Sequence, residues 1–195
     1  MSEDLKTQLA KFYPLAGQAA KHPPYCDLSV AECYIQFCAE LAGKEFRDPR
    51  GESVVILERN FPKLLGMKRA DPTTGKLIIN PDTGKPIKAK ASHVLEQLRN
   101  GTFQNAAHGV EKGRIRTLFW IPDVIIAPDA IHPNAHRVVA GDEVYVKRYV
   151  KDGNDVKLVV MEPVEGGQRV IITSFLTDGA DLARYVGMPP IWQKK

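Results

Sequence analysis

The fold of this chain is decided by residues 144–175, which read VYVKRYV KDGND VKLVVM EPVEGG QRVIITSF. Three segments of this stretch are rich in β-branched and aromatic residues, and two breaks that contain glycine separate them. In the first segment apolar or aromatic residues alternate with others, which is the period of a β-strand. Because the breaks are too short for a crossover connection, consecutive strands must pair antiparallel. The stretch therefore predicts a three-stranded antiparallel meander on which the upstream chain packs.

Helices are expected upstream of the meander. Apolar residues recur at helical spacing from Leu5 to Ala20, although Pro14 would end or kink that helix. A second helix, capped by Asp27 or Ser29 and ended near Gly43, has one apolar face. The sequence therefore predicts the α+β class, in which helices come first and a mostly antiparallel sheet follows.

Shorter elements are expected between these parts. The β-branched run Ser53 to Glu58 predicts a strand, and the run Ile115 to Ala127 predicts one strand or two, bent at Pro122. Val94 to Leu98 predicts a short helix. Between residues 70 and 90, two turn signals predict a protruding hairpin or loop that carries four lysines.

The length and composition favour a single domain over residues 1–195. Residues 1–50 would form its helical N-terminal part, and residues 51–195 its sheet-containing core. The formal net charge of +4 permits a polyanionic partner without requiring one. The first residues lack the apolar core of a signal peptide, and no run approaches the ~18 apolar residues of a membrane span. We therefore expect a protein that resides in a cytoplasm or reaches one by other means, and that does not contact a membrane.

The three cysteines fall in one amphipathic stretch, at Cys26, Cys33 and Cys38. Their odd number and their spacing argue against a disulfide framework and against a structural zinc site. We expect them to be reduced, metal-free core residues. His132 and His136 are spaced i, i+4 and could hold a metal, but no cysteine or carboxylate pair accompanies them, so solvated loop histidines are the favoured interpretation.

The polar residues of the meander are the best functional candidates, because the motifs of phosphate-binding loops, metalloproteases and serine hydrolases are absent. Successive strand residues point to opposite faces, so Tyr145, Lys147 and Tyr149 share one face. Such an aromatic and cationic stripe can stack a base and neutralise a phosphate. The same pattern also fits an ordinary solvent face whose lysine protects the sheet. Both interpretations stay open on these residues alone.

A resemblance to a known family comes from four short motifs in the C-terminal two-thirds of the chain. The motifs are NFPKLLGM at 60–67, VLEQLRNG at 94–101, YVKRY at 145–149 and TSF at 173–175. With them the chain resembles the phage-associated branch of the barnase, EndoU, colicin and RelE-like (BECR) nuclease superfamily. The resemblance implies a metal-independent ribonuclease without cofactor, with N-terminal helices packed on a curved, mostly antiparallel sheet of four or more strands.

One position departs from the family pattern. The first motif of the family carries a histidine where this chain has Lys63, which can bind phosphate but is a poor general base unless it is desolvated. His93 or His108 could replace that histidine, because either could titrate near neutrality. Each also has a simpler interpretation, His93 as a residue at a helix start and His108 as a loop residue.

The chemistry of RNA transesterification assigns roles to the remaining residues. The reaction needs a base for the 2′-OH, an acid for the leaving 5′-oxygen and cations on the phosphorane. Lys147 and Arg116 would stabilise the phosphorane, and Tyr145 or Tyr149 would stack a base or donate a proton. The candidate catalytic residues are therefore Lys63, His93, Arg116, Tyr145, Lys147 and Ser174, and the candidate substrate-binding residues are Tyr149, Thr173 and His108.

Three hypotheses follow for the function. The first is a metal-independent endoribonuclease of a toxin system or mobile element, with RNA as substrate and a cognate inhibitor protein as partner. The second is a catalytically inactive module of the same fold that binds RNA or a protein. The third is a plain interaction domain whose resemblance to the nucleases is accidental.

Overall fold

The structure is a computed structural model that describes residues 20–21, 23–136, 141–150, 155–164, 166–177, 179–187 and 189–194. The chain divides into two compact units. The first, here the sheet unit, comprises Met1–Pro24, Glu45–Val55 and Trp120–Lys195. The second, here the helical unit, comprises Tyr25–Lys44 and Ile56–Phe119. The single-domain expectation stays a prediction. The first expected helix, over residues 5–20, lies almost entirely outside the described residues.

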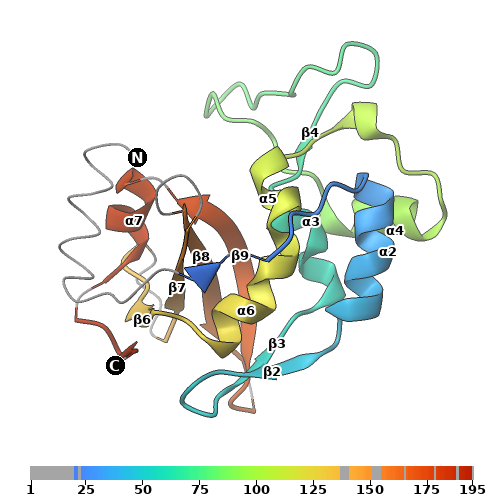
Figure 1. Cartoon of the computed structure of the whole chain (residues 1–195). Coiled ribbons are helices and arrows are strands. Elements are labelled where there is room, and N and C mark those ends of the chain that lie inside the picture. The colour runs from blue at the N-terminus through green and yellow to red at the C-terminus, as the bar shows by residue number, and fades with distance from the viewer. Residues whose placement is uncertain are drawn as a thin grey trace. The chain divides into compact units, whose positions relative to one another are not determined.

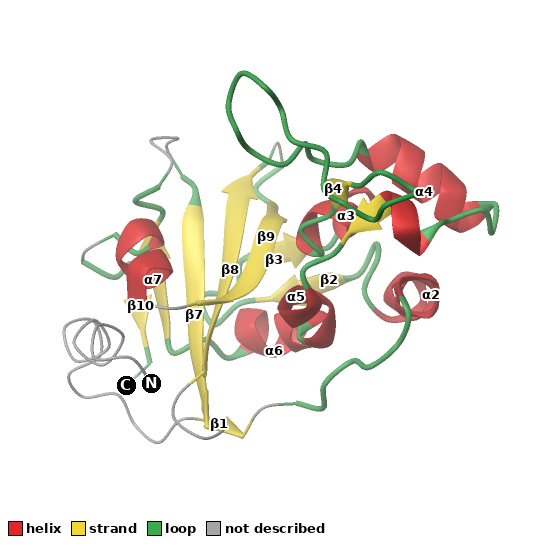
Figure 2. Cartoon of the chain, turned by 90° about the horizontal axis from the view of Figure 1, so that it is seen from above, coloured by secondary structure: helices red, strands yellow, loops and turns green. Residues whose placement is uncertain are grey.

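The sheet unit is built around the predicted meander, which is confirmed. Strands β7, β8 and β9 pair antiparallel in series and run side by side in both ribbon views (Figures 1 and 2). The sheet is curved and mixed, because β3 pairs parallel with β9 and β1 pairs parallel with β7. Its order is β10-β6-β7-β8-β9-β3-β2. The bounds are β1 Ala20–Lys21, β2 Glu45–Arg47, β3 Ser53–Val55, β6 Ala130–Pro133, β7 Glu143–Val150, β8 Asp155–Pro163, β9 Arg169–Thr177 and β10 Trp192–Gln193.

One face of the meander is an apolar core covered by α7 (Gly179–Tyr185). Alternate residues of β7 lie in this core, as the period of a strand requires. The buried members of the cluster are Ala130, Val144, Val146, Val160, Ile172, Phe175, Leu182 and Val186. The other face of β7 packs against α6 (Ile121–Ile126) and against Trp120, whose ring lies 4.9 Å from that of Tyr149. Both faces of the central strand are therefore covered within the sheet unit.

The strand expected over residues 115–127 is wrong. The segment forms the end of α5 (Lys112–Arg116), the 3-10 turn η3 (Leu118–Trp120) and the helix α6. Pro122 lies in the first turn of α6. Proline is tolerated there because an N–H group in the first turn of a helix has no carbonyl acceptor within the helix. A buried apolar run of this length has no periodicity that separates strand from helix.

The helical unit contains the second expected helix, α2 (Val30–Glu40), which is confirmed. Ser29 is its N-cap: the hydroxyl accepts from Glu32 N at 3.3 Å and the Glu32 carboxylate accepts from Ser29 N at 3.0 Å. This reciprocal pair is a capping box. The apolar face buries Phe37, whose ring lies 5.0 Å from that of Phe61 in α3 (Phe61–Leu64).

The other elements of the helical unit are short. The predicted helix near residues 94–98 is confirmed as α4 (Ala91–Arg99). The strand predicted over residues 53–58 ends at Val55, in the sheet unit, and Glu58 begins a 3-10 turn. The remaining bounds are η1 Glu58–Asn60, β4 Lys68–Arg69, η2 Asn105–Ala107 and β5 His108–Gly109. No helix among the described residues is long and apolar enough to cross a membrane.

Two expectations about single residues are corrected by their burial. Cys26 and Cys33 are buried free thiols as predicted, but Cys38 is exposed because it lies one position past Phe37, off the apolar face of α2. His132 is not a solvated loop residue, because it lies in β6 with none of its surface exposed. Its Nδ1 lies 2.9 Å from the Gly187 carbonyl oxygen. His136 is exposed, as predicted.

Candidate functional site

The predicted site residues are divided between the two units. The sheet unit holds the candidates from the meander, and the helical unit holds the histidines, the lysine of the first motif and the arginine. The meander group is Tyr145, Lys147, Tyr149, Thr173 and Ser174, and the helical group is Lys63, His93, His108 and Arg116.

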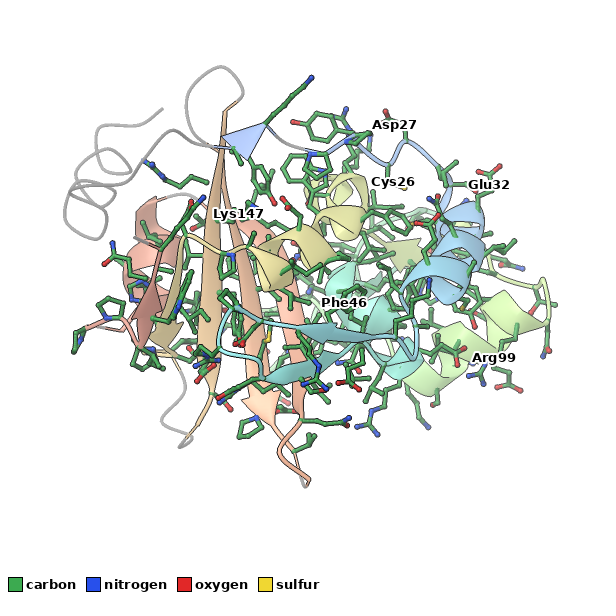
Figure 3. The ribbon with its side chains drawn as sticks, turned by 60° about the horizontal axis from the view of Figure 1, so that its bottom comes forward. Cys26, Asp27, Glu32, Phe46, Arg99 and Lys147 are labelled. Atoms are coloured by element: carbon green, nitrogen blue, oxygen red, sulfur yellow. The ribbon has the colours of Figure 1, made fainter. Side chains whose placement is uncertain are left out.

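The stripe expected on the meander is buried. Tyr145, Lys147 and Tyr149 do share one face of β7, but their exposed fractions are 0%, 5% and 0%. The Lys147 ammonium lies 2.9 Å from Asp123 Oδ1, and the Tyr149 hydroxyl donates to Asp123 Oδ2 at 2.6 Å. Figure 3 shows Lys147 on its strand beside the helix α6 that carries Asp123. The expectation of an open face that stacks bases is therefore wrong.

The two tyrosines are also poor proton donors at neutral pH. Burial, reinforced by the carboxylate of Asp123, raises the pKa of Tyr149. Burial likewise raises the pKa of Tyr145, whose hydroxyl donates to Asp48 Oδ2 at 2.7 Å. Desolvation opposes loss of the phenolic proton in both cases. The surroundings of the two tyrosines therefore do not support the expectation that one of them donates a proton in catalysis.

Tyr145 instead belongs to a polar network around Arg50. The Arg50 guanidinium donates to the Tyr145 hydroxyl at 2.8 Å and lies 2.7 Å from both Asp48 and Glu143. Burial alone would raise the pKa of Asp48, but hydrogen bonds from Tyr145 and Arg50 hold that pKa below its ordinary value. The network connects the loop between β2 and β3 to β7, which is a structural role.

Thr173 and Ser174 are neighbours on β9 and point to opposite faces of it. Ser174 pairs across β8 through Val159 with Tyr145, so its side chain shares the buried face with Lys147. Ser174 is 1% exposed, and its Oγ has no hydrogen-bond partner within the described part of the chain. Thr173 is half-buried on the other face. Neither hydroxyl lies on an open surface of the sheet.

A pocket in the helical unit brings two of the predicted residues together. Its volume is about 410 Å³, which lies within the range of ~300–1,000 Å³ typical of small-molecule sites. The residues come from the segment that begins α2 and from the chain between η2 and the end of α5. The lining residues are Cys26, Asp27, Leu28, Ser29, Val30, Asn105, His108, Val110, Lys112, Ile115 and Arg116.

His108 is the titratable ring of this pocket. Its Nε2 lies 3.1 Å from Gln97 Oε1, so this nitrogen carries the proton and Nδ1 has the lone pair. Nδ1 is buried without a hydrogen-bond partner in the described chain. The Phe103 ring stacks on the imidazole at 5.0 Å and 7°. Burial, followed by the charges of His93 and Arg69, lowers the pKa of His108, which keeps the ring neutral near pH 7.

Arg116 forms another part of the pocket wall. It ends α5 and does not belong to the sheet, which corrects the expected placement. Its Nε lies 3.0 Å from Asp27 Oδ1, and its guanidinium stands 4.2 Å from the centre of the Tyr25 ring. The Cys26 N–H donates to the Arg116 carbonyl at 2.8 Å, which fixes α5 against the segment before α2. Figure 3 shows Cys26 and Asp27 on that segment and Glu32 in the helix after it.

The other two helical candidates do not line the pocket. Lys63 is exposed on α3, and His93 is exposed on α4 one turn before Gln97. The sequence did not identify Asn105 or Lys112 as site residues, and it assigned Asp27 only a capping role. No pattern in the sequence distinguishes these side chains, because tertiary packing alone brings them to His108.

Among the described residues, no group of three or more His, Cys, Asp or Glu side chains is arranged to hold a metal ion. The chain has no match among the known proteins with which it was compared: no family model, curated protein or solved structure matches it.

Proposed function

We propose that the protein is a metal-independent endoribonuclease that cleaves RNA by transesterification, with the pocket of the helical unit as its nucleotide site. The proposal rests on the motif resemblance to the BECR nucleases and on the chemistry of the pocket. A fold of that superfamily, an RNA substrate in the cytoplasm and a cognate inhibitor protein belong to the same proposal, as does a role in a toxin system or mobile element.

The main support for the proposal is the protonation state of the His108 ring. A general base must be unprotonated at the working pH, and the lowered pKa of His108 meets this requirement. The proton on Nε2 faces Gln97, so the lone pair of Nδ1 is the acceptor that remains. A buried acceptor without a partner carries a free-energy cost that a substrate hydroxyl would relieve. Because Nδ1 is shielded in the free protein, binding must shift a neighbouring side chain, as often happens at interfaces.

The cleavage step can then be written with these groups. Nδ1 of His108 takes the proton of the 2′-hydroxyl, the 2′-oxygen bonds to phosphorus, and the bond from phosphorus to the 5′-oxygen breaks. The leaving 5′-oxygen takes up a proton, and we assign the acid role to His93 because it lies one turn before Gln97, the hydrogen-bond partner of His108. Lys112 and Arg116 line the pocket and would balance the charge of the phosphorane. The products are a 2′,3′-cyclic phosphate end and a 5′-hydroxyl end.

The test uses the purified full chain with labelled single-stranded RNA in excess EDTA. We expect cleavage that leaves cyclic phosphate ends, and a loss on the order of 10²- to 10⁴-fold in rate for His108→Ala. His136→Ala is the matched control, because this exposed histidine lies in the sheet unit, and its rate should match the parent protein. Circular dichroism of each variant checks the fold. Full activity in His108→Ala, or products with linear 3′-phosphate from the start, would remove the assignment.

A second candidate function is a catalytically inactive module that binds RNA or a protein. The burial of Tyr145, Lys147 and Ser174 favours it, because these candidate catalytic residues are covered within the sheet unit. Lys63, in place of the family's histidine, also favours it. Salt-dependent RNA binding without any cleavage in the same assay would select this candidate.

A further inference from the structure

Residues 68–90 contain a short tandem repeat that the proposed chemistry does not use. The hexapeptide DPTTGK at 71–76 recurs as NPDTGK at 80–85, nine residues later. Each copy contains an Asp or Asn, a glycine and a lysine at the same relative positions. We call residues 68–90 the tandem-turn arm, and Figure 1 shows the chain after β4 extending as a long excursion.

The two copies fold into the same turn. The Asp71 carboxylate accepts from the N–H groups two and three residues on, at 3.0 and 2.7 Å. The Asn80 side-chain oxygen accepts from the equivalent groups at 2.8 and 3.3 Å. Gly75 and Gly84 have φ angles of 67° and 64°, which a side chain rarely permits, and each donates back to the first residue of its turn. The lysine after each glycine therefore projects from an equivalent, hydrogen-bonded turn.

Main-chain bonds join the two turns to the base of the arm. Ile78 N donates to Arg69 O at 3.0 Å, Ile87 N donates to Ile78 O at 2.9 Å, and Arg69 N donates to Ile87 O at 2.8 Å. These bonds link the segments around Arg69, Ile78 and Ile87 pairwise to one another. The arm therefore has a defined, hydrogen-bonded main chain, although it protrudes as the sequence predicted.

The net charge of the whole chain resides in this arm. Residues 68–90 contain six basic and two acidic side chains, a formal net charge of +4, which equals that of the full chain. The other parts of the chain contain 21 basic and 21 acidic residues and are formally neutral. Hydrogen bonds within its own turn hold the Asp71 carboxylate and lower its pKa, and among the described residues this carboxylate forms no salt bridge with a lysine.

The lysines of the arm are open to a ligand. All four are exposed, and within the described residues none of their ammonium groups takes part in a salt bridge. Leu77 and Ile79, between the two turns, have exposed fractions of 41% and 47%. The four lysines are Lys76, Lys85, Lys88 and Lys90.

We propose that the tandem-turn arm is a nucleic-acid-binding arm in which Lys76 and Lys85 contact successive parts of an RNA phosphate backbone. Lysines supply point charges without the bidentate geometry that recognises single carboxylates, which suits a repeating polyanion. Such contacts hold the RNA without reading its sequence, while Leu77 and Ile79 pack against sugars or bases. The inference rests on RNA as the ligand of the proposed function and assigns its binding to a surface other than the pocket.

The experiment measures binding of a fully 2′-O-methylated 20-nucleotide RNA, which transesterification cannot cleave. Affinity is measured from 50 to 200 mM salt for the full chain, for Lys76→Ala/Lys85→Ala and for the control Lys44→Ala/Arg59→Ala. The control removes the same charge from exposed positions of the helical unit outside the arm. Loss of two phosphate contacts should lower the slope of log K against log salt by about 1.4, because each contact to a single strand contributes about 0.7. The control slope should stay that of the parent protein.

The outcomes separate the arm from the pocket. Because the RNA cannot be cleaved, the result does not depend on whether the protein is an enzyme, and His136→Ala, an exposed position of the sheet unit, should bind with the parent slope. An unchanged slope in Lys76→Ala/Lys85→Ala, or an equal change in the control, would overturn the proposal. Binding of poly-glutamate through these lysines, without binding of RNA, would also overturn it and assign the arm to an acidic protein partner.

Discussion

The ammonium of Lys147 lies 2.9 Å from the carboxylate of Asp123, on the face of β7 that was expected to meet RNA. The Lys147 side chain is 7% exposed and that of Asp123 is 38% exposed, so the pair spans from the buried face of the sheet to solvent. The same carboxylate accepts from the Tyr149 hydroxyl. One acid on α6 thus organises two polar residues of the strand that it covers.

Lys147→Ala should therefore destabilise the protein, because Lys147 is buried and paired with Asp123. The substitution removes the Lys147 ammonium from the carboxylate and from the main-chain carbonyl of Asp123, so each of these acceptors has one partner fewer. We expect a loss of about 1–3 kcal/mol in the free energy of unfolding, measured by urea denaturation. Lys44→Ala, at an exposed position, should stay within about 0.5 kcal/mol of the parent protein. Equal stabilities for the two variants would show that the Lys147 contact contributes nothing.

Ser29→Ala should weaken the start of α2. It removes the hydroxyl that accepts from Glu32 N and leaves that N–H without its capping partner. The expected loss in unfolding free energy is about 1 kcal/mol. Ser92→Ala is the comparison, because Ser92 is exposed within α4, where alanine is the better helix former. A Ser29→Ala variant as stable as the parent protein would mean that the capping box is not formed in solution.

The stability of the protein should fall as the pH falls from 7 toward 5. Burial lowers the pKa of His132, although its hydrogen bond to Gly187 acts in the opposite direction. Above the pKa of about 6.5 that histidine has in the unfolded chain, the His132 ring is neutral in both the folded and the unfolded protein, so its titration costs no stability. Below about 6.5 the unfolded chain binds a proton that the folded chain resists, so stability is lost by at most about 1.4 kcal/mol per pH unit.

The measurement for this prediction is the melting temperature between pH 7.5 and 5. His132→Gln should show a smaller decrease than the parent protein, because it removes the buried titrating ring. His136→Gln, at an exposed position, should follow the parent protein. Parallel curves for all three proteins would contradict the assignment.

The pKa of His108 should lie below its ordinary value and should respond to Arg69. Burial is the first cause of the lowered pKa, and the charges of His93 and Arg69 add to it. Removal of one like charge in Arg69→Ala should raise the pKa toward 6.5. Titration of the imidazole by NMR measures this directly, and Arg59→Ala serves as the charge-matched control. A His108 pKa above 6.5 in the parent protein would disqualify this ring as the proposed base.

Local signals in the sequence were enough to predict several elements of the fold. The alternation and the breaks of residues 144–175 were sufficient for the antiparallel meander, because strand period and short connections leave no other pairing. A capping residue, Asp27 or Ser29, and the apolar face behind it predicted α2, and the structure shows that Ser29 is the cap. Alternation also placed Tyr145, Lys147 and Tyr149 correctly on one face.

Which surfaces of the sheet are covered depends on tertiary packing and could not be predicted from local patterns. The alternation of residue types predicts which residues of β7 share a face, but it does not predict what packs on that face. The helix that covers it is α6, whose apolar run was expected to form a strand. The pocket was equally beyond the sequence, because Asp27, His108 and Arg116 meet through the packing of α5 against the segment before α2. Contacts between residues so far apart along the chain leave no local pattern, since they depend on the whole unit being folded.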